Sequence, residues 1–440
     1  MSRVNSHTSD GHIYRIEGAR RLGAEHPQTL TFQDGELSEK LPAVNDQSCI
    51  EINANGCLIL PGFIDLYSRC REPGLTRKGT IASESIAALS AGFTQVMCSP
   101  DTIPIVDNVA TVELISHRSD QVKGGATVIP MAALTLGLQG QQLSELATLQ
   151  AAGCPVASQA DYPIESTTVL YSAMQYASSF NMPLLLTARD AQLGIDGCAH
   201  SGATATQLGL PTIPVAAETV ALSRLIELCR DTHCQLHISR ISSARAVQQI
   251  DDAKQAGLPI TCDVGIHHLF FTDRLLTGYD ASFHCAVPFR GHTDRQALRE
   301  GLSNGVIDAI CSDHAPHDID AGLAPFPVTE PGLSAYDWFI PLLLQLPEVT
   351  GMTLEQVFNK LHQGPNIILN RKSASTSEPD AMTGFLLLDP DASIESTSDT
   401  WLSAGSNNPL AKHDATELGL LPLRGRVKTT FHDGWCSHFS

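Results

Sequence analysis

Residues 61–74 read PGFIDLYSRCREPG and join a short apolar run to a cluster of charged residues. The apolar run GFIDLY (62–67) has the length and composition of a buried β-strand. In a barrel of parallel strands, functional residues lie at the carboxyl ends of the strands. We therefore interpret 61–74 as a first barrel strand followed by candidate site residues.

Seven further apolar runs follow this strand at regular intervals. They are FTQVMC (93–98), TVIPMAAL (127–134), CPVAS (154–158), MPLLLTA (182–188), CQLHIS (234–239), LPITCDV (258–264) and VIDAICS (306–312). Helix-like segments lie between them, for example at 80–92, 219–232 and 244–257. Eight strands alternating with helices predict an α/β fold with a (β/α)8 barrel of the TIM type. A doubly wound sheet is the competitor, but it would normally carry a Gly-rich phosphate-binding turn, and the sequence has none.

The two ends of the chain differ from this pattern. Residues 1–58 predict short strands with turns, whereas 371–398, rich in Ser, Thr, Asp and Pro, predict a loop. The tail returns to strand-like runs, including LRGRVKTTFHDG (423–434), in which Asp433-Gly434 is a turn signal. The predicted domains are a small composite β domain formed by 1–58 plus 374–440, and the barrel at 59–373.

The composition describes a globular protein with a large core. Of the 440 residues 42% are hydrophobic and 17% are charged, and the formal net charge is -19. An acidic surface of this size repels nucleic acid and anionic membranes, so we expect neither as a partner. A local basic patch that binds an anionic ligand is still compatible with this net negative charge.

Twelve cysteines are scattered singly, with no Cys-x-x-Cys pair, and many lie in apolar runs. This pattern favours reduced, buried thiols over a disulfide framework. The first twelve residues are polar and contain no apolar signal core. The longest apolar stretches, such as FIPLLL (339–344), are too short to span a bilayer. We therefore expect a cytoplasmic protein.

Several motifs occur in a fixed order along the chain. They are REPG (71–74), MCSPDTIPIVDN (97–108), TCDVGIHHLFFTD (261–273), CAVPFR (285–290), CSDHAPH (311–317) and EPGLS (330–334). Together they resemble dihydroorotase of the cyclic amidohydrolase superfamily, over nearly the whole chain. The resemblance implies an amidohydrolase-type barrel with its site at the strand ends.

The first strand departs from that family. In working members it carries Asp-x-His-x-His, and two imidazoles spaced i, i+2 on a strand point the same way and ligate one zinc ion. Here Asp65 is retained, but Tyr67 and Arg69 stand at the two histidine positions. An arginine stays protonated in a protein, so it cannot ligate zinc and would repel it.

The other ligand positions of the family are also replaced. Gln159 aligns with the carbamylated lysine or aspartate of the fourth strand, and Asp161 lies two residues further on. Thr187 and Arg240 stand where the fifth and sixth strands of the family end with histidine ligands. Only Asp313 of the eighth strand is retained. One carboxylate does not make a zinc site, which needs about four ligands.

Some residues that contact substrate in the family persist, as the resemblance implies. Arg71 matches the arginine that binds the substrate carboxylate, and Arg290 and His317 lie in matching segments. Asp101 stands where the family usually has Asn. Asp313 would be the family's proton shuttle, so without a metal we regard it as a remnant and predict no catalytic residue.

Local structural roles compete with these interpretations. Arg69 could pair with Asp313 to fill the space of the absent metal, and Arg240 could join them. Arg71 could pair with Glu72 and brace the loop after the first strand. The neighbouring His267 and His268 would then be packing or hydrogen-bonding residues, as would His314 and His317 on their loop.

Proteins similar to this one, with the histidines replaced, are partners of aspartate carbamoyltransferase in some bacteria. The resemblance therefore implies a catalytically inactive dihydroorotase homologue. It would act as a structural or assembly subunit with the aspartate carbamoyltransferase catalytic chain in pyrimidine biosynthesis. It would use no cofactor and form a homo-oligomer or a hetero-oligomer.

Two alternatives stay open. The first is an active, metal-dependent cyclic amidohydrolase whose altered metal site uses Asp313, Asp161 and some of the 17 histidines. The second is a metal-free binder of an anionic pyrimidine precursor, for which Arg71 and Arg290 are the candidate residues.

Overall fold

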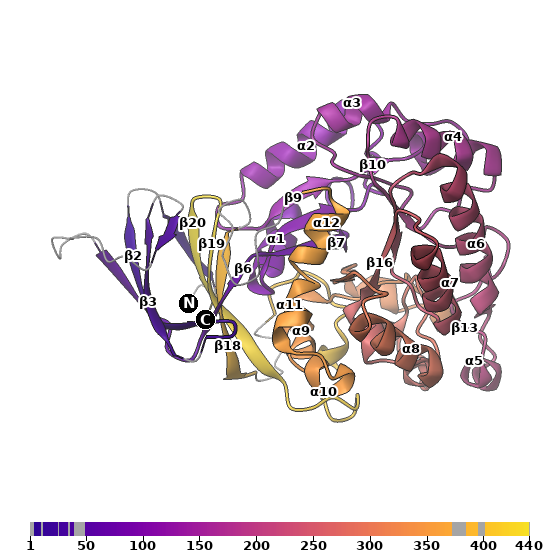
Figure 1. Cartoon of the computed structure of the whole chain (residues 1–440). Coiled ribbons are helices and arrows are strands. Elements are labelled where there is room, and N and C mark those ends of the chain that lie inside the picture. The colour runs from indigo at the N-terminus through magenta and orange to yellow at the C-terminus, as the bar shows by residue number, and fades with distance from the viewer. Residues whose placement is uncertain are drawn as a thin grey trace.

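The computed structural model describes residues 4–9, 12–24, 26–33, 36–38, 49–371, 384–394 and 401–439. A β-sheet built from both ends of the chain lies beside a larger body of strands and helices (Figure 1). The two ends of the chain lie close together, beside this sheet (Figure 1).

The terminal sheet has nine strands. They are β1 (Val4–Thr8), β2 (Ile13–Arg21), β3 (Gln28–Gln33), β4 (Glu36–Ser38), β5 (Cys49–Asn53), β6 (Leu58–Pro61), β18 (Phe385–Ser393), β19 (Arg424–His432) and β20 (Trp435–Phe439). Their order is β1-β20-β19-β18-β6-β2-β3-β4, and β5 pairs with β2. Strands from the first 61 residues and from the last 56 therefore form one sheet, as the composite β unit predicted.

The turn signal at Asp433-Gly434 joins β19 to β20. The two residues have φ values of 48° and 72°, the left-handed conformation that a two-residue hairpin turn of type I′ requires. The loop predicted at 371–398 is wrong in part, because β18 occupies Phe385–Ser393. Its first four residues are apolar and buried, since β18 pairs with β6 on one side and β19 on the other.

The barrel strands follow the eight predicted apolar runs. They are β7 (Phe63–Ser68), β8 (Phe93–Cys98), β9 (Thr127–Pro130) with β10 (Ala132–Ala133), β11 (Ala157–Ser158), β12 (Leu184–Thr187), β15 (Leu236–Ser239), β16 (Ile260–Gly265) and β17 (Ala309–Cys311). All pair in parallel with their neighbours, in the runs β7-β8-β9 and β10-β11-β12-β15-β16-β17. A short two-stranded sheet of β13 (Ala199–His200) and β14 (Thr212–Ile213) lies apart.

Parallel contacts also link the first barrel strand with the last. Ser68, at the end of β7, forms a parallel bridge with His314, just after β17. The strand interiors are filled by buried apolar side chains, among them Ile64, Leu66 and Leu185. Buried residues without alternation are typical of parallel strands covered on both faces. The arrangement is that of a TIM-type barrel, and the doubly wound alternative is wrong.

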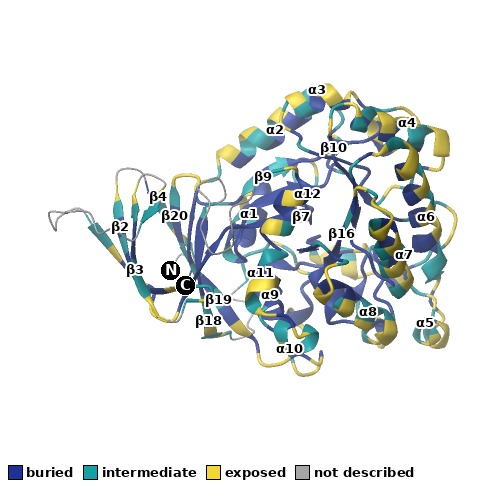
Figure 2. Ribbon diagram, in the orientation of Figure 1, coloured by how far each residue is buried: buried dark blue, intermediate teal, exposed yellow. Residues whose placement is uncertain are grey.

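Helices cover the strands on the outside. They are α1 (Ile81–Ser90), α2 (Val109–Asp120), α3 (Leu146–Ala151), α4 (Thr167–Ser178), α5 (Ala203–Leu208), α6 (Val215–Thr232), α7 (Ala244–Gln255), α8 (His292–Ser303), α9 (Tyr336–Leu343), α10 (Leu346–Thr350), α11 (Leu354–Asn359) and α12 (Gln363–Ile368). They present exposed residues outward and buried ones to the strands (Figure 2). The predicted helices at 80–92, 219–232 and 244–257 correspond to α1, α6 and α7.

Two further expectations concern the cysteines and the domain limits. All twelve thiols are free and eleven are buried, as the scattered pattern predicted. The predicted limit at 373/374 lies outside the described residues, and the limits as a whole stay a prediction. Among the described residues, no helix has the length and apolar character needed to cross a membrane.

Candidate functional site

The carboxyl ends of the barrel strands surround one end of the barrel, which we call the mouth. Buried, charged side chains line this mouth. Arg69, after β7, donates from Nε to Asp101 at 2.8 Å and from Nη2 to Asp161 at 2.5 Å. The Arg69 side chain is 9% exposed, and each carboxylate is 15% exposed. The predicted pair of Arg69 with Asp313 is therefore wrong, because Asp101 and Asp161 already occupy the donors of this guanidinium.

Arg240, after β15, is the second cation of the mouth. Its Nη1 donates to Asp313 at 2.9 Å, and its Nη2 donates to Asp161 and to Thr187 Oγ1, the latter at 2.6 Å. The Arg240 side chain is fully buried. Asp161 thus bridges the two arginines. We call the five residues Arg69, Asp101, Asp161, Arg240 and Asp313 the mouth ion network.

Tyr67 lies between the two cations. The Arg240 guanidinium carbon is 3.6 Å from the centre of the Tyr67 ring, and that of Arg69 is 5.3 Å away. Both are cation–π distances, and the Tyr67 hydroxyl accepts a hydrogen bond from Ser99. The phenol ring of Tyr67, on β7, therefore contacts both guanidinium groups.

The backbone that carries these side chains is unusual at several strand ends. Four non-glycine residues within three positions after the end of a barrel strand have positive φ: Arg71 (63°), Ala160 (51°), Arg240 (58°) and Asp313 (47°). Each such residue costs on the order of 1 kcal/mol. The surrounding hydrogen bonds hold them, for example Asp263 Oδ1, which accepts from the Arg240 amide at 2.5 Å.

The ion network keeps its acids charged. Burial alone would raise the pKa of Asp313, but the charge of Arg240 and a hydrogen bond from His267 outweigh it and hold the pKa well below its usual value. Burial is likewise outweighed at Asp161 by Arg240 and then Arg69, which lower its pKa. Two cations face three carboxylates, so the network carries about one net negative charge.

His267 and His268 lie in the short 3-10 helix that follows β16 and are buried. His267 Nε2 is 3.4 Å from Asp313 Oδ2, so this ring contacts the mouth ion network. His268 Nε2 instead hydrogen-bonds the Val287 carbonyl, and burial lowers its pKa to about 3. The two rings therefore have different partners: His267 contacts Asp313, and His268 hydrogen-bonds the backbone.

Gln159 is not part of the ion network. Its Nε2 donates to Thr135 Oγ1 and to the Leu138 carbonyl, both at 2.9 Å, so it braces the loop after β10. Asp161, two residues further on, is the residue of this strand that reaches the mouth. The sequence pointed to Gln159 at this strand end, with Asp161 two residues further on, and the left-handed conformation of Ala160 lies between the two residues.

Arg71 and His317 contact each other at one edge of the mouth. Arg71 donates from Nε to the Pro316 carbonyl, and its Nη2 lies 2.8 Å from His317 Nε2. Burial, and next the charge of Arg71, lower the pKa of His317 to about 3. The predicted pair of Arg71 with Glu72 is wrong, because Glu72 binds Arg118 and the amide of Ile81.

Arg290 lies in a pocket beside the network, and Asp161 and Arg240 of the network also line it. Arg290 donates to Ser242 Oγ and to the Ile213 carbonyl, and its Nη2 is 4.0 Å from Glu218. Arg189 is among the other residues that line the pocket. Arg71 and Arg290, both predicted as residual ligand residues, therefore line different parts of the mouth.

Two further buried carboxylates, Asp65 and Glu84, have partners that the sequence did not predict, and Glu84 was not among the candidate residues. Asp65 accepts from the amide and hydroxyl of Ser312 and from Tyr336, which joins β7 to the end of β17. Glu84 on α1 lies 2.8 Å from His314 Nε2. The one available signal for Glu84 was a carboxylate on the apolar face of a predicted helix.

A parallel-stranded barrel with charged side chains at its strand ends, beside a sheet from both termini, defines an amidohydrolase-type protein. Solved structures share this fold. The L-hydantoinase (dihydropyrimidinase) from Arthrobacter aurescens matches with a TM-score of 0.77 at 18% identity, covering 95% of this chain and 94% of that one. The dihydropyrimidinase from Brevibacillus agri matches with a TM-score of 0.76 at 17% identity, covering 96% and 94%.

Comparisons of the sequence identify the family more specifically than the shared fold does. Residues 56–246 match the family described as Dihydro-orotase-like. A "Dihydroorotase-like protein" of Pseudomonas aeruginosa is 38% identical over 387 residues, 88% of this chain and 89% of the relative. A "Dihydroorotase" of Syntrophotalea carbinolica is 32% identical over 412 residues, 94% and 95% of the two chains. The chain therefore belongs to the dihydroorotase-like family of cyclic amidohydrolases.

Proposed function

We propose that this protein is a non-catalytic member of its family that serves as an assembly subunit for the aspartate carbamoyltransferase catalytic chain in pyrimidine biosynthesis. One observation carries the non-catalytic part. The space at the strand ends is filled by two buried guanidinium groups that contact all three nearby carboxylates. No residue of this network is left to bind a metal or a reacting amide.

The residues at the mouth do not fit the zinc that the family resemblance implies. Zinc needs about four nitrogen, sulfur or carboxylate ligands close together. Among the described residues, no three such ligand atoms at the mouth lie within 4.8 Å of one another. Arg69 and Arg240 also place two permanent charges beside Asp161, and these would repel a dication.

Asp313 is likewise poorly suited to proton transfer. A general base is most effective when its pKa lies near the working pH. The contacts with Arg240 and His267 instead hold the pKa of Asp313 below its usual value. The carboxylate is 7% exposed and already accepts from Arg240 at 2.9 Å, so a substrate proton would have to displace an existing ion pair.

The loops of the mouth support the partner part of the proposal. Of the twelve large apolar side chains that are exposed among the described residues, nine lie on loops that follow barrel strands. Three of them, Ile319, Leu323 and Val328, belong to the segment after β17 and are 71%, 74% and 69% exposed. Clustered exposed apolar side chains are typical of protein interfaces. We expect the carbamoyltransferase to contact this segment, which we call the 318–328 segment.

Two measurements test the proposal. The purified chain should not hydrolyse dihydroorotate above background, with or without added Zn²⁺ or Mn²⁺. Activity that is lost in a folded Asp313→Asn variant would overturn the non-catalytic assignment and favour the altered metal site. Affinity purification from the native source should recover an aspartate carbamoyltransferase catalytic chain in fixed ratio. Recovery of this chain alone, as a homo-oligomer, would overturn the assembly role.

A second candidate rests on the pocket beside Arg290. The pocket is lined by three arginines, Arg189, Arg240 and Arg290, and by two carboxylates, Asp161 and Glu218. The cations exceed the acids by one, and guanidinium groups suit anionic ligands. The pocket favours a metal-free binder of a pyrimidine precursor such as dihydroorotate or carbamoyl aspartate. Calorimetric titration of either compound tests this. Heat that disappears in an Arg290→Gln variant supports it, and no heat at millimolar ligand counts against it.

A further inference from the structure

The two ends of the chain bring three metal-binding side chains together on the terminal sheet, far from the mouth ion network in sequence. They are His7 on β1 and Cys436 and His438 on β20. One ligand atom of each residue, a histidine nitrogen or the Cys436 sulfur, lies within 4.8 Å of the other two. Among the described residues this is the one such group of three His, Cys, Asp or Glu.

The sheet register explains why the three side chains meet. β1 is antiparallel to β20, and His7 is the direct partner of Cys436. Directly opposed residues of an antiparallel pair project from the same face, and so do residues two apart on one strand. Cys436 and His438 are therefore on one face with His7. The His7 and His438 rings are stacked with their centres 5.5 Å apart.

The distance between the Cys436 sulfur and the His438 nitrogen suits a metal ion with tetrahedral coordination. Zinc binds cysteine sulfur at about 2.3 Å and histidine nitrogen at about 2.0 Å. At a tetrahedral angle these two ligands are about 3.5 Å apart, and Cys436 Sγ lies 3.5 Å from His438 Nε2. An ion could therefore be placed between them with little movement of either side chain.

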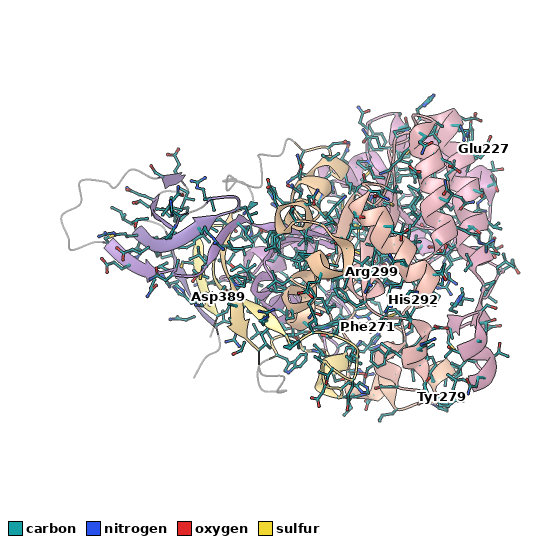
Figure 3. All side chains as sticks on the ribbon, turned by 60° about the horizontal axis from the view of Figure 1, so that its bottom comes forward. Glu227, Phe271, Tyr279, His292, Arg299 and Asp389 are labelled. Carbon is teal, nitrogen blue, oxygen red and sulfur yellow. The ribbon has the colours of Figure 1, made fainter. Side chains whose placement is uncertain are left out.

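A neighbouring hydroxyl orients one ligand. Thr429 Oγ1 lies 3.0 Å from His438 Nδ1, which leaves Nε2 to face the sulfur. Second ring nitrogens of metal-binding histidines normally have such a partner. Thr429 and His438 also line an open groove that includes Asp389. Asp389 lies on the terminal sheet, well away from Glu227 and His292 on the barrel helices (Figure 3). The groove therefore reaches the His438 side of the three residues.

We propose that His7, Cys436 and His438 bind one Zn²⁺ ion, with a water molecule as fourth ligand. The Cys436 thiol gives up its proton to solvent as the zinc–sulfur bond forms. The ion links β1, at the edge of the sheet, to β20, and so joins the two ends of the chain. The site is independent of the proposed function at the barrel mouth.

Cobalt(II) is the probe for this site, because its thiolate complexes absorb in the near ultraviolet. The full-length chain, freed of metal with a chelator, should bind one Co²⁺ with a sulfur-to-cobalt charge-transfer band that one equivalent of Zn²⁺ abolishes. Cys436→Ser should lose the band. His7→Ala changes only an edge strand and should weaken binding by more than about 100-fold. The matched control Cys49→Ser removes another thiol of the same sheet and should keep band and affinity.

Two results would each overturn the proposed zinc site. One is the absence of the charge-transfer band in the folded wild-type chain, and the other is a band that persists in Cys436→Ser. Because Cys436 is buried, the Cys436→Ser variant is first checked for folding by circular dichroism. If it does not fold, the His7→Ala comparison decides. Zn²⁺ should raise the Tm of wild type and Cys49→Ser by a few degrees and leave that of His7→Ala unchanged.

Discussion

Arg240 and Asp313 form an ion pair of 2.9 Å between the ends of two barrel strands, and both residues have positive φ, 58° and 47°. The backbone at each strand end is therefore in a disfavoured conformation that directs the two side chains toward each other. Such strain persists only where the surroundings stabilise it. Here the stabilising contacts include Asp161, Thr187 and the ring of Tyr67.

We expect Arg240→Met to destabilise the fold by about 3–5 kcal/mol, because removing one partner leaves buried carboxylates unpaired. Urea denaturation measures the free energy of unfolding. Arg77→Ala is the matched control, since Arg77 pairs with Asp318 but is 71% exposed and should cost less than about 1 kcal/mol. Equal effects of the two substitutions would show that the mouth ion network contributes no special stability.

Arg240 should also block a metal site at the mouth. A Tyr67→His, Arg69→His variant places two imidazoles on and after β7, but Arg240 still contacts Asp161 and Asp313. We expect this double variant to bind no more zinc than wild type at equilibrium dialysis. Adding Arg240→His should increase the bound zinc by one ion per chain. Extra zinc in the double variant would show that Arg240 does not exclude the metal.

The apolar side chains of the 318–328 segment should matter for assembly. We expect Ile319→Ser, Leu323→Ser and Val328→Ser together to weaken binding to the aspartate carbamoyltransferase catalytic chain by roughly 100-fold or more. Sedimentation of the mixed proteins measures this. Ile367→Ser is the control, since Ile367 is 60% exposed on α12 and outside the mouth loops. Unchanged assembly in the triple variant would place the interface elsewhere.

Stability should fall in mildly acidic solution. Burial lowers the pKa of His284 to about 4 and that of His268 to about 3, so the unfolded chain, with pKa near 6.5, binds these protons more readily. The stabilisation is complete above about pH 6.5 and is lost as pH falls toward 4. Between pH 7.5 and pH 5, each of these two histidines should lower the free energy of unfolding by roughly 2 kcal/mol.

Denaturation of His284→Gln at the same pH values tests this origin. In the wild-type chain His284 Nδ1 lies 2.7 Å from Thr329 Oγ1, and a glutamine amide can keep that hydrogen bond without titrating. We expect a smaller loss of unfolding free energy between pH 7.5 and 5 than in wild type. The same loss in both proteins would assign the pH dependence to other groups.

Much of the fold followed from local sequence pattern. The eight apolar runs are barrel strands because each is short, rich in apolar residues and separated from the next by a helix. The one large local error, the loop at 371–398, arose because a polar composition concealed the apolar run at the start of β18. That run became a strand through pairing with β6 and β19, which come from both halves of the chain.

The sequence by itself determined which residue types stand at the strand ends: the phenol of Tyr67 and the guanidinium groups of Arg69 and Arg240. Residue identity is enough there, because an arginine keeps its charge in any fold. Only the tertiary structure decided the partners. Arg69 pairs with Asp101 and Asp161, and Arg240 pairs with Asp313 and Asp161. These partners lie 32 to 92 residues apart in the sequence, so the pairing depends on the backbone direction at each strand end. The same holds for His7 and Cys436, whose meeting requires the register of two strands from opposite ends of the chain.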